Sequence, residues 1–246
     1  MRQGVQGGVA SPLTWTGGQG RLWLTPRRWP VTLEYTLLVA ATLCAVGFLW
    51  QCRQAPSAMR SAIKTASVAL LALAAHQAGA PVLLIAALLA CAAGDYCLSR
   101  DGDSAFMAGI AAFAVGHLAY ITLFLGQTDS SWARLVESPR LVTLVALICL
   151  GLVMARLLAP RAGPLKGPVL CYIPIILGMG VAALTLPGQG ALVWLLPAAL
   201  VFVLSDLILA TEIFLLPRDH PGQRVTPYCV WVTYWGAQLG FFAAFA

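Results

Sequence analysis

Long apolar runs alternate with short polar links from residue 31 to the end of the 246-residue chain. Each run is close to the roughly 20 residues that a helix needs to cross about 30 Å of hydrocarbon. The runs predict eight membrane-spanning helices, with boundaries near 31–50, 57–76, 81–99, 104–125, 140–159, 166–186, 191–216 and 225–245. The expected fold class is therefore all-α, a polytopic membrane protein built as one helical bundle.

The composition supports a membrane protein and argues against binding to nucleic acid. The chain is 60% hydrophobic and 10% charged, with a mean hydropathy of +0.83, which lies outside the range of soluble globular domains. Its net charge is +6, but the Lys and Arg residues are scattered singly over the tail and the links. We therefore expect contact with anionic membrane lipids and no nucleic-acid partner. The distribution of Lys and Arg over the links favours even-numbered helices that begin in the cytosol, although the arginines of the tail count the other way.

The chain divides into an N-terminal tail, residues 1–30, and an eight-helix domain, residues 31–246. The tail is rich in Gly, Arg and Trp without apolar periodicity, so we expect it to be disordered, to end in an interfacial segment and not to be a cleaved signal peptide. The seven cysteines show neither a CxxC nor a zinc-type spacing. We expect them to be small buried apolar residues.

Two aspartates lie inside the apolar runs. Asp95 follows Gly94 near the end of the third run, and Asp206 follows Ser205 within the seventh. An Asp at a helix centre costs about 2.5 to 3.5 kcal/mol, so such a residue is expected to face a protein interior or a wet cavity. Similar short surroundings, ACAAGDYCLS and FVLSDLILA, suggest a parallel 4+4 repeat. We predict that the two carboxylates meet at the interface of this repeat.

Other polar side chains lie at depths that one cavity, open to one side of the membrane, could reach. At 1.5 Å per residue, four of them lie about 10 to 20 Å from that side, namely Lys64, Tyr172, His117 and Gln238. Tyr120 shares a helix face with His117, and Ser205 directly precedes Asp206. Each residue also has a purely structural interpretation, because Lys64 could neutralise a carboxylate and the others could form interhelical hydrogen bonds. Glu212, closer to the membrane surface, is expected to be solvated or to cap a helix.

Two carboxylates in a low-dielectric site share one proton and can act as an acid and a base at neutral pH. Glycosidases and aspartic proteases use such pairs. A zinc site formed by Asp95, Asp206 and His117 is the competing interpretation, but it lacks a recognised ligand spacing. The sequence has no GxSxG, HExxH or phosphate-binding loop that would indicate another known mechanism.

The polar, aromatic and glycine residues at certain positions within the runs resemble those of a known family. They occur in the order Gly94-Asp95, Phe106, Gly109, Phe113, His117, Tyr120, Ser205-Asp206 and Gln238. With this spacing, residues 31–245 resemble the lysoplasmalogenase (YhhN-like) transmembrane family. The resemblance implies an endoplasmic reticulum membrane hydrolase that cleaves the vinyl ether bond of lysoplasmalogens. The products would be a fatty aldehyde and glycerophosphocholine or glycerophosphoethanolamine, with no metal or organic cofactor.

With this resemblance, we expect Asp95 and Asp206 to be the general acid/base pair. Lys64 or His117 would bind the phosphate or tune the pair, and the remaining substrate-binding candidates are Tyr120, Tyr172, Ser205 and Gln238. The expected partners are a lysophospholipid substrate and membrane lipids, and a homodimer is left open. A lipid or small-solute transporter is the alternative function, because intramembrane charges and a 4+4 repeat also describe transporters. A retinal-type pigment built on Lys64 is a third.

Overall fold

Eight α-helices and four short 3-10 helices form the protein in the computed structural model, which describes residues 31–246. The α-helices are α1 (Val31–Leu49), α2 (Ala58–Gln77), α3 (Val82–Leu98), α4 (Asp103–Leu125), α5 (Arg140–Leu158), α6 (Lys166–Leu184), α7 (Leu195–Phe214) and α8 (Thr226–Phe245). No strand occurs between residues 31 and 246. The predicted all-α fold is confirmed, and each predicted run coincides with one helix to within a few residues. The predicted disordered tail, residues 1–30, lies outside the described residues.

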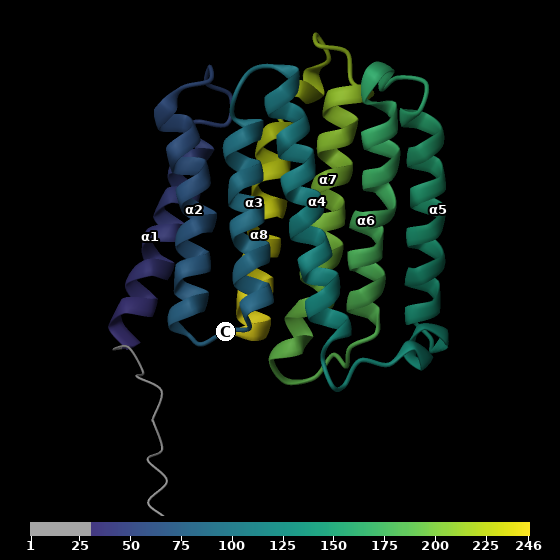
Figure 1. Cartoon of the computed structure of the whole chain (residues 1–246). Coiled ribbons are helices and arrows are strands. Elements are labelled where there is room, and N and C mark those ends of the chain that lie inside the picture. The colour runs from purple at the N-terminus through teal and green to yellow at the C-terminus, as the bar shows by residue number, and fades with distance from the viewer. Residues whose placement is uncertain (1–30) are drawn as a thin grey trace, which may run out of the picture.

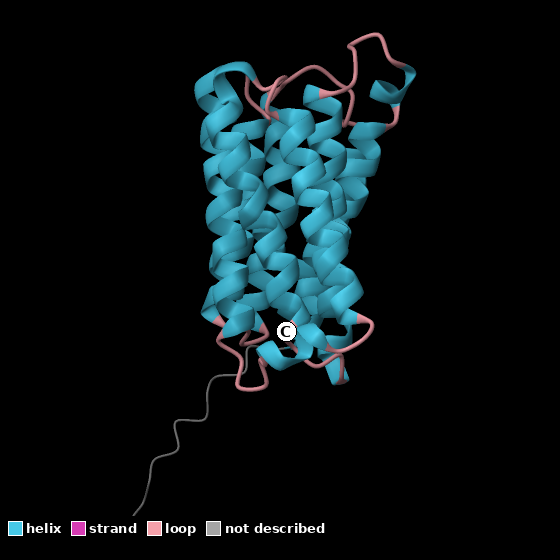
Figure 2. Ribbon diagram, turned by 90° about the vertical axis from the view of Figure 1, so that its right-hand side faces the viewer, coloured by secondary structure: helices cyan, strands magenta, loops and turns pink. Residues whose placement is uncertain are grey.

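Short loops make consecutive helices run in opposite directions, so α1 begins and α8 ends at the same end of the bundle (Figure 1). We call the opposite end, which carries the α1–α2, α3–α4, α5–α6 and α7–α8 loops, the upper end. Figure 2 shows the helices stacked side by side with loops only at the two ends. The last helix, α8, lies behind α3 and contacts α1, α2, α3 and α7, so it closes the bundle across its first half.

Several of the helices are long and apolar enough to cross a membrane. Within residues 31–246 five meet this criterion of length and composition, at Ala58–Gln77, Asp103–Leu125, Arg140–Leu158, Gly163–Leu184 and Gly190–Phe214. Two shorter apolar helices, Leu33–Leu49 and Val82–Leu98, lie beside them. The chain is thus a multi-pass membrane protein. The count of eight spans and the 4+4 repeat stay predictions.

Small residues bring the helices of the bundle close together. A Cβ added to Gly116 on α4 would lie 2.7 Å from the Cys91 sulfur and 3.2 Å from the Ala87 carbonyl oxygen, both on α3. Only glycine fits at this crossing, which places the polar faces of α3 and α4 next to each other.

The expectation that the cysteines are buried is wrong for three of the seven. Cys149, Cys171 and Cys229 are exposed, because their positions face outward from the bundle, where an apolar solvent is expected.

Candidate active site

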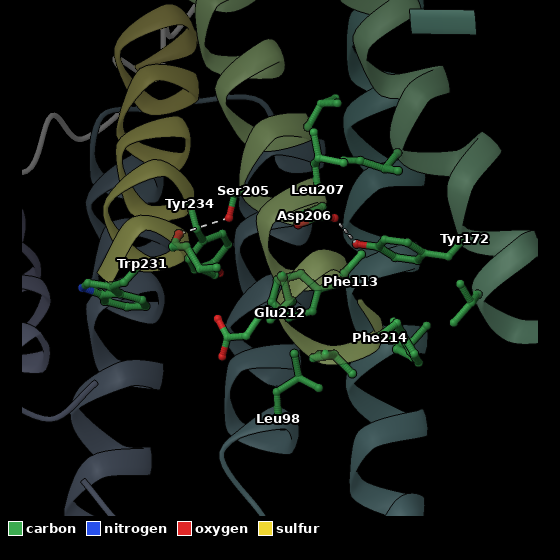
Figure 3. Close-up of a pocket in the computed structure, with 18 of the residues that line it drawn as sticks. Leu98, Phe113, Tyr172, Ser205, Asp206, Leu207, Glu212, Phe214, Trp231 and Tyr234 are labelled. Carbon is green, nitrogen blue, oxygen red and sulfur yellow. Dashed lines mark hydrogen bonds between the residues drawn. The ribbon is translucent and has the colours of Figure 1, made fainter. Parts of the chain in front are cut away.

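A cavity of about 440 Å³ lies in the upper half of the bundle, within the size range of small-molecule sites. Side chains from all eight α-helices line it. The wall formed by α5 and α6 is apolar except for Tyr172 on α6, and it includes Leu150, Gly151, Met154, Ile173, Ile176 and Leu177. The other polar lining residues come from the remaining helices and include both aspartates. Figure 3 shows the lining residues from Trp231 and Tyr234 on α8, past Asp206 on α7, to Tyr172 on α6.

Asp95 lies on α3 and has a basic and a hydroxyl partner. Its Oδ1 atom is 3.0 Å from Nζ of Lys64 on α2. The Tyr234 hydroxyl on α8 donates a hydrogen bond of 2.7 Å to its Oδ2 atom. The preceding residue must be small, because a Cβ on Gly94 would lie 2.6 Å from the ring of Phe113. Three helices therefore hold a carboxylate whose exposed fraction is only 1%.

Asp206 lies on α7 beside a tyrosine and a histidine. The Tyr172 hydroxyl on α6 donates a hydrogen bond of 2.6 Å to its Oδ2 atom, which Figure 3 shows across the cavity. Nε2 of His117 lies 4.0 Å from the same oxygen, beyond hydrogen-bond distance. Among the described residues, no ion pair joins Asp206 to a Lys or Arg side chain. The two aspartates line one cavity and differ in their partners.

The orientation of the His117 ring restricts where protons lie near Asp206. Nδ1 of His117 is 2.7 Å from the Phe113 carbonyl oxygen, which can only accept, so Nδ1 carries a hydrogen. In the neutral ring Nε2 is then an acceptor without a hydrogen, and it is buried with no hydrogen-bond partner among residues 31–246. Two acceptors, Nε2 and the Asp206 carboxylate, thus face each other. A proton on either of them would relieve this arrangement.

The predicted site residues divide into those that line the cavity and those beneath it. Lys64, Asp95, Tyr172, Ser205 and Asp206 line the cavity. The other three, His117, Tyr120 and Gln238, are completely buried and do not line it.

The three deeper residues form a floor. The Tyr120 hydroxyl donates to Oε1 of Gln238, and the Phe202 ring packs against both His117 and Tyr120. Ser205, although it lines the cavity, donates its hydroxyl to the Val230 carbonyl oxygen and so ties α7 to α8.

No hydrogen bond joins the two carboxylates within residues 31–246, so the sharing of one proton between them remains a prediction. Those residues also contain no group of three His, Cys, Asp or Glu side chains placed to bind a metal ion. The Asp95, Asp206 and His117 zinc site, the competing interpretation from sequence, therefore lacks the geometry it needs.

Among the lining residues that the sequence did not predict are Arg60, Trp231 and Tyr234, and Glu212 was expected to be solvated or to cap a helix. Glu212 instead lines the cavity and has one buried carboxylate oxygen. Trp231, Tyr234 and Gln238 are spaced three and four apart and share one face of α8, a signal that was available. Arg60 and Glu212 could not be found in this way, because single charges near helix ends are usually solvated.

Comparison with known proteins bears on this site. A model of the YhhN family matches residues 59–245, a range that includes every charged residue of the cavity. The chain belongs to the YhhN family. The resemblance seen in the sequence is thereby confirmed. This YhhN-family chain is similar to the human (Homo sapiens) protein Lysoplasmalogenase TMEM86B, with 30% identity over 197 residues that span 80% of this chain and 68% of that protein. No solved structure matches it.

Proposed function

We propose that this YhhN-family membrane protein hydrolyses the vinyl ether bond of lysoplasmalogens by acid/base catalysis with Asp95 and Asp206. The observation that carries the proposal is the contrast between two aspartates in one largely apolar cavity. Within the described part of the chain, Asp95 has a Lys partner and Asp206 has neither a Lys nor an Arg partner. Pairs of titratable groups in contrasting environments commonly divide acid and base roles between them. The similarity to a human lysoplasmalogenase supports the choice of substrate.

Asp206 is the acid in this proposal. A carboxyl group that donates a proton must hold it before the reaction, and Asp206 has the Tyr172 hydroxyl and the His117 imidazole beside it rather than a cation. Asp95, held by Lys64 and Tyr234, is the carboxylate that stabilises positive charge as it develops.

The chemistry needs only water. Asp206 transfers its proton to the alkenyl carbon distal to the ether oxygen, which produces an oxocarbenium ion beside Asp95. Water adds to the carbon attached to oxygen and gives its proton to the Asp206 carboxylate, which restores the acid. The resulting hemiacetal then loses its hydroxyl proton and its carbon–oxygen bond to glycerol breaks, while the glycerol oxygen takes up a proton. The products are a fatty aldehyde and the glycerophosphoryl headgroup.

The apolar wall of α5 and α6 suits the alkenyl chain. Leu150, Met154 and Ile173 present hydrocarbon to the cavity. Their helices, α5 and α6, lie on the opposite side of the bundle from α2, which carries Lys64 (Figure 1). Burial of chain methylenes there contributes about 0.8 kcal/mol each, so this wall would supply much of the affinity. The headgroup would then lie toward the upper end, where the charged residues gather.

Turnover of a matched lipid set tests the proposal. Purified protein in detergent is given an alkenyl lysolipid, its ester analogue and its saturated alkyl analogue, and aldehyde and fatty acid are measured by mass. We expect aldehyde from the alkenyl lipid alone. Transport of the intact lipid into vesicles without cleavage would overturn the proposal in favour of a carrier.

Isotope labelling tests the bond that breaks. In heavy-oxygen water the label should be absent from the glycerophosphoryl product, because water adds to the alkenyl carbon rather than to glycerol. In deuterated water the aldehyde, reduced at once to the alcohol, should carry one deuterium at the carbon next to the former carbonyl. Label in the glycerol oxygen would exclude the mechanism. Residence in the endoplasmic reticulum membrane is part of the same proposal, and a homodimer stays a prediction.

A further inference from the structure

Glu212 is a charged residue of the cavity that the proposed chemistry does not use. It lies two residues before the end of α7, about 3 Å along the helix axis from the upper end. Its Oε2 atom is buried and accepts no hydrogen bond, and no ion pair involves it within residues 31–246. Figure 3 shows the carboxylate directed toward α8, on the side of Trp231. A buried carboxylate oxygen with no partner is costly and points to a cationic ligand.

The two nearby cations have other partners. Nζ of Lys64 pairs with Asp95 and lies 5.9 Å from the ring centre of Trp231. Arg60 donates from Nε to the Gln51 carbonyl oxygen and from Nη2 to that of Cys52, which leaves its Nη1 group without a hydrogen bond in the described part of the chain. The face of the Arg60 guanidinium lies over the Phe48 ring, 5.4 Å from its centre. Among residues 31–246, the upper end of the cavity thus offers one unpaired carboxylate and the Nη1 group of one guanidinium.

Cys52, in the α1–α2 loop, lines the same cavity as Arg60, Lys64 and Glu212. Burial raises the pKa of this thiol to about 11, while Arg60 and Lys64 lower the pKa and Glu212 raises it. Three charged side chains from two helices therefore act on one buried sulfur atom. A ligand at the upper end would meet opposite charges within a short distance.

We propose that Glu212 binds the ammonium group of the lipid headgroup and that Arg60 binds its phosphate. The identity of the lipid rests on the proposed function. A primary ammonium has three N–H donors, and a carboxylate accepts them as strong charge-assisted hydrogen bonds. Glu212 lies six residues after Asp206, about 9 Å along α7, a distance that an extended glycerophosphoethanolamine can bridge with its vinyl ether at Asp206. The cavity thereby selects zwitterionic over purely anionic headgroups.

The test compares two lipids, of which one carries the aminoethyl group with its ammonium on the phosphate and the other ends in the phosphate. Alkenyl lysophosphatidylethanolamine and alkenyl lysophosphatidic acid are given to the wild type, to Glu212→Gln and to the control Asp219→Asn, which removes an exposed carboxylate at the same end. In Glu212→Gln we expect the ratio of kcat/KM for the ethanolamine lipid to that for the phosphate lipid to fall about tenfold or more. The change should come from a rise in KM for the ethanolamine lipid, with kcat unchanged. Asp219→Asn should keep the wild-type ratio.

A binding measurement separates this inference from the proposed function. The saturated alkyl ether analogues of both lipids carry no vinyl ether, so their affinities are independent of turnover. Tighter binding of the ethanolamine analogue to the wild type, and loss of this difference in Glu212→Gln, supports the inference even if no alkenyl lipid is cleaved. Equal affinity of the wild type for both analogues overturns it, and this result does not depend on the folding of any variant. An unchanged ratio in a folded Glu212→Gln protein also overturns it.

Discussion

Lys64 on α2 and Asp95 on α3 form an ion pair of 3.0 Å inside the bundle, where the Asp95 side chain is 1% exposed and the Lys64 side chain 18%. The Lys64 ammonium also lies 5.8 Å from the ring centre of Phe48 and 5.9 Å from that of Trp231. Contacts with aromatic faces reduce the cost of keeping this cation away from water. The pair joins α2, α3 and, through Tyr234, α8 on one side of the cavity.

Removal of the cation should destabilise the protein. Lys64→Met leaves Asp95 buried with only the Tyr234 hydroxyl, and breaking a buried ion pair in this way costs about 3 to 5 kcal/mol of unfolding free energy. Thermal unfolding in detergent measures the loss. The double variant Lys64→Met/Asp95→Asn should recover part of the stability, because no charge is then left unpaired. Equal stability of the wild type and Lys64→Met would contradict the pairing.

Removal of either carboxyl group should abolish turnover without unfolding the chain. Asp206→Asn cannot donate the proton and Asp95→Asn cannot stabilise the cation, so each should lose at least about a hundredfold in aldehyde release. The measurement is the initial rate with purified, folded variants, and Asp219→Asn is the matched control on the surface. Near-normal turnover in either variant would remove that residue from the mechanism.

The Tyr172 hydroxyl should matter for kcat more than for stability. Tyr172→Phe deletes the hydrogen bond to Oδ2 of Asp206 and leaves the ring in place. Asp206 becomes a charged carboxylate as it gives up its proton, and hydrogen bonds to charged groups contribute about 1.5 to 3 kcal/mol, so we expect kcat to fall at least about tenfold. Tyr228→Phe, on the exposed side of α8, serves as the control. A variant with changed KM and normal kcat would instead assign Tyr172 to substrate binding.

Gly116 should tolerate no side chain. In Gly116→Ala the new Cβ would meet the Cys91 sulfur and the Ala87 carbonyl, so α3 and α4 must move apart at a cost of about 1 to 3 kcal/mol. Gly236→Ala on α8 has nothing within 4 Å of its new Cβ and should be neutral or slightly stabilising. Unfolding temperatures of the two variants give the comparison. The same melting temperature for both would argue against close α3–α4 packing.

Cys52 should react slowly and report the charges around it. With its pKa raised to about 11, the thiol is protonated at neutral pH, so alkylation should accelerate about tenfold per pH unit between about pH 8 and about pH 10. Glu212→Gln removes a charge that raises this pKa and should speed alkylation, whereas Arg60→Met should slow it. Site-resolved mass detection separates Cys52 from the exposed cysteines. Identical rates in all three proteins would place these charges away from Cys52.

The pattern of apolar runs along the sequence was sufficient to predict the helices of this protein. Eight apolar runs appear as eight helices, since each run must satisfy its backbone polar groups internally in an apolar solvent. The cost of burying a carboxylate likewise identified Asp95 and Asp206 as residues that face the interior, because this cost depends on local sequence alone.

Only the tertiary structure decided which partner each polar residue received. Lys64 could have paired with either aspartate, and the packing of α2 against α3 selected Asp95. The same packing placed His117, Tyr120 and Gln238 beneath the cavity, and it turned the Glu212 carboxylate into its upper end. The depth of a side chain along its helix follows from its residue number. The helix that a side chain faces depends on neighbours that are distant in sequence, so sequence periodicity cannot determine its partner.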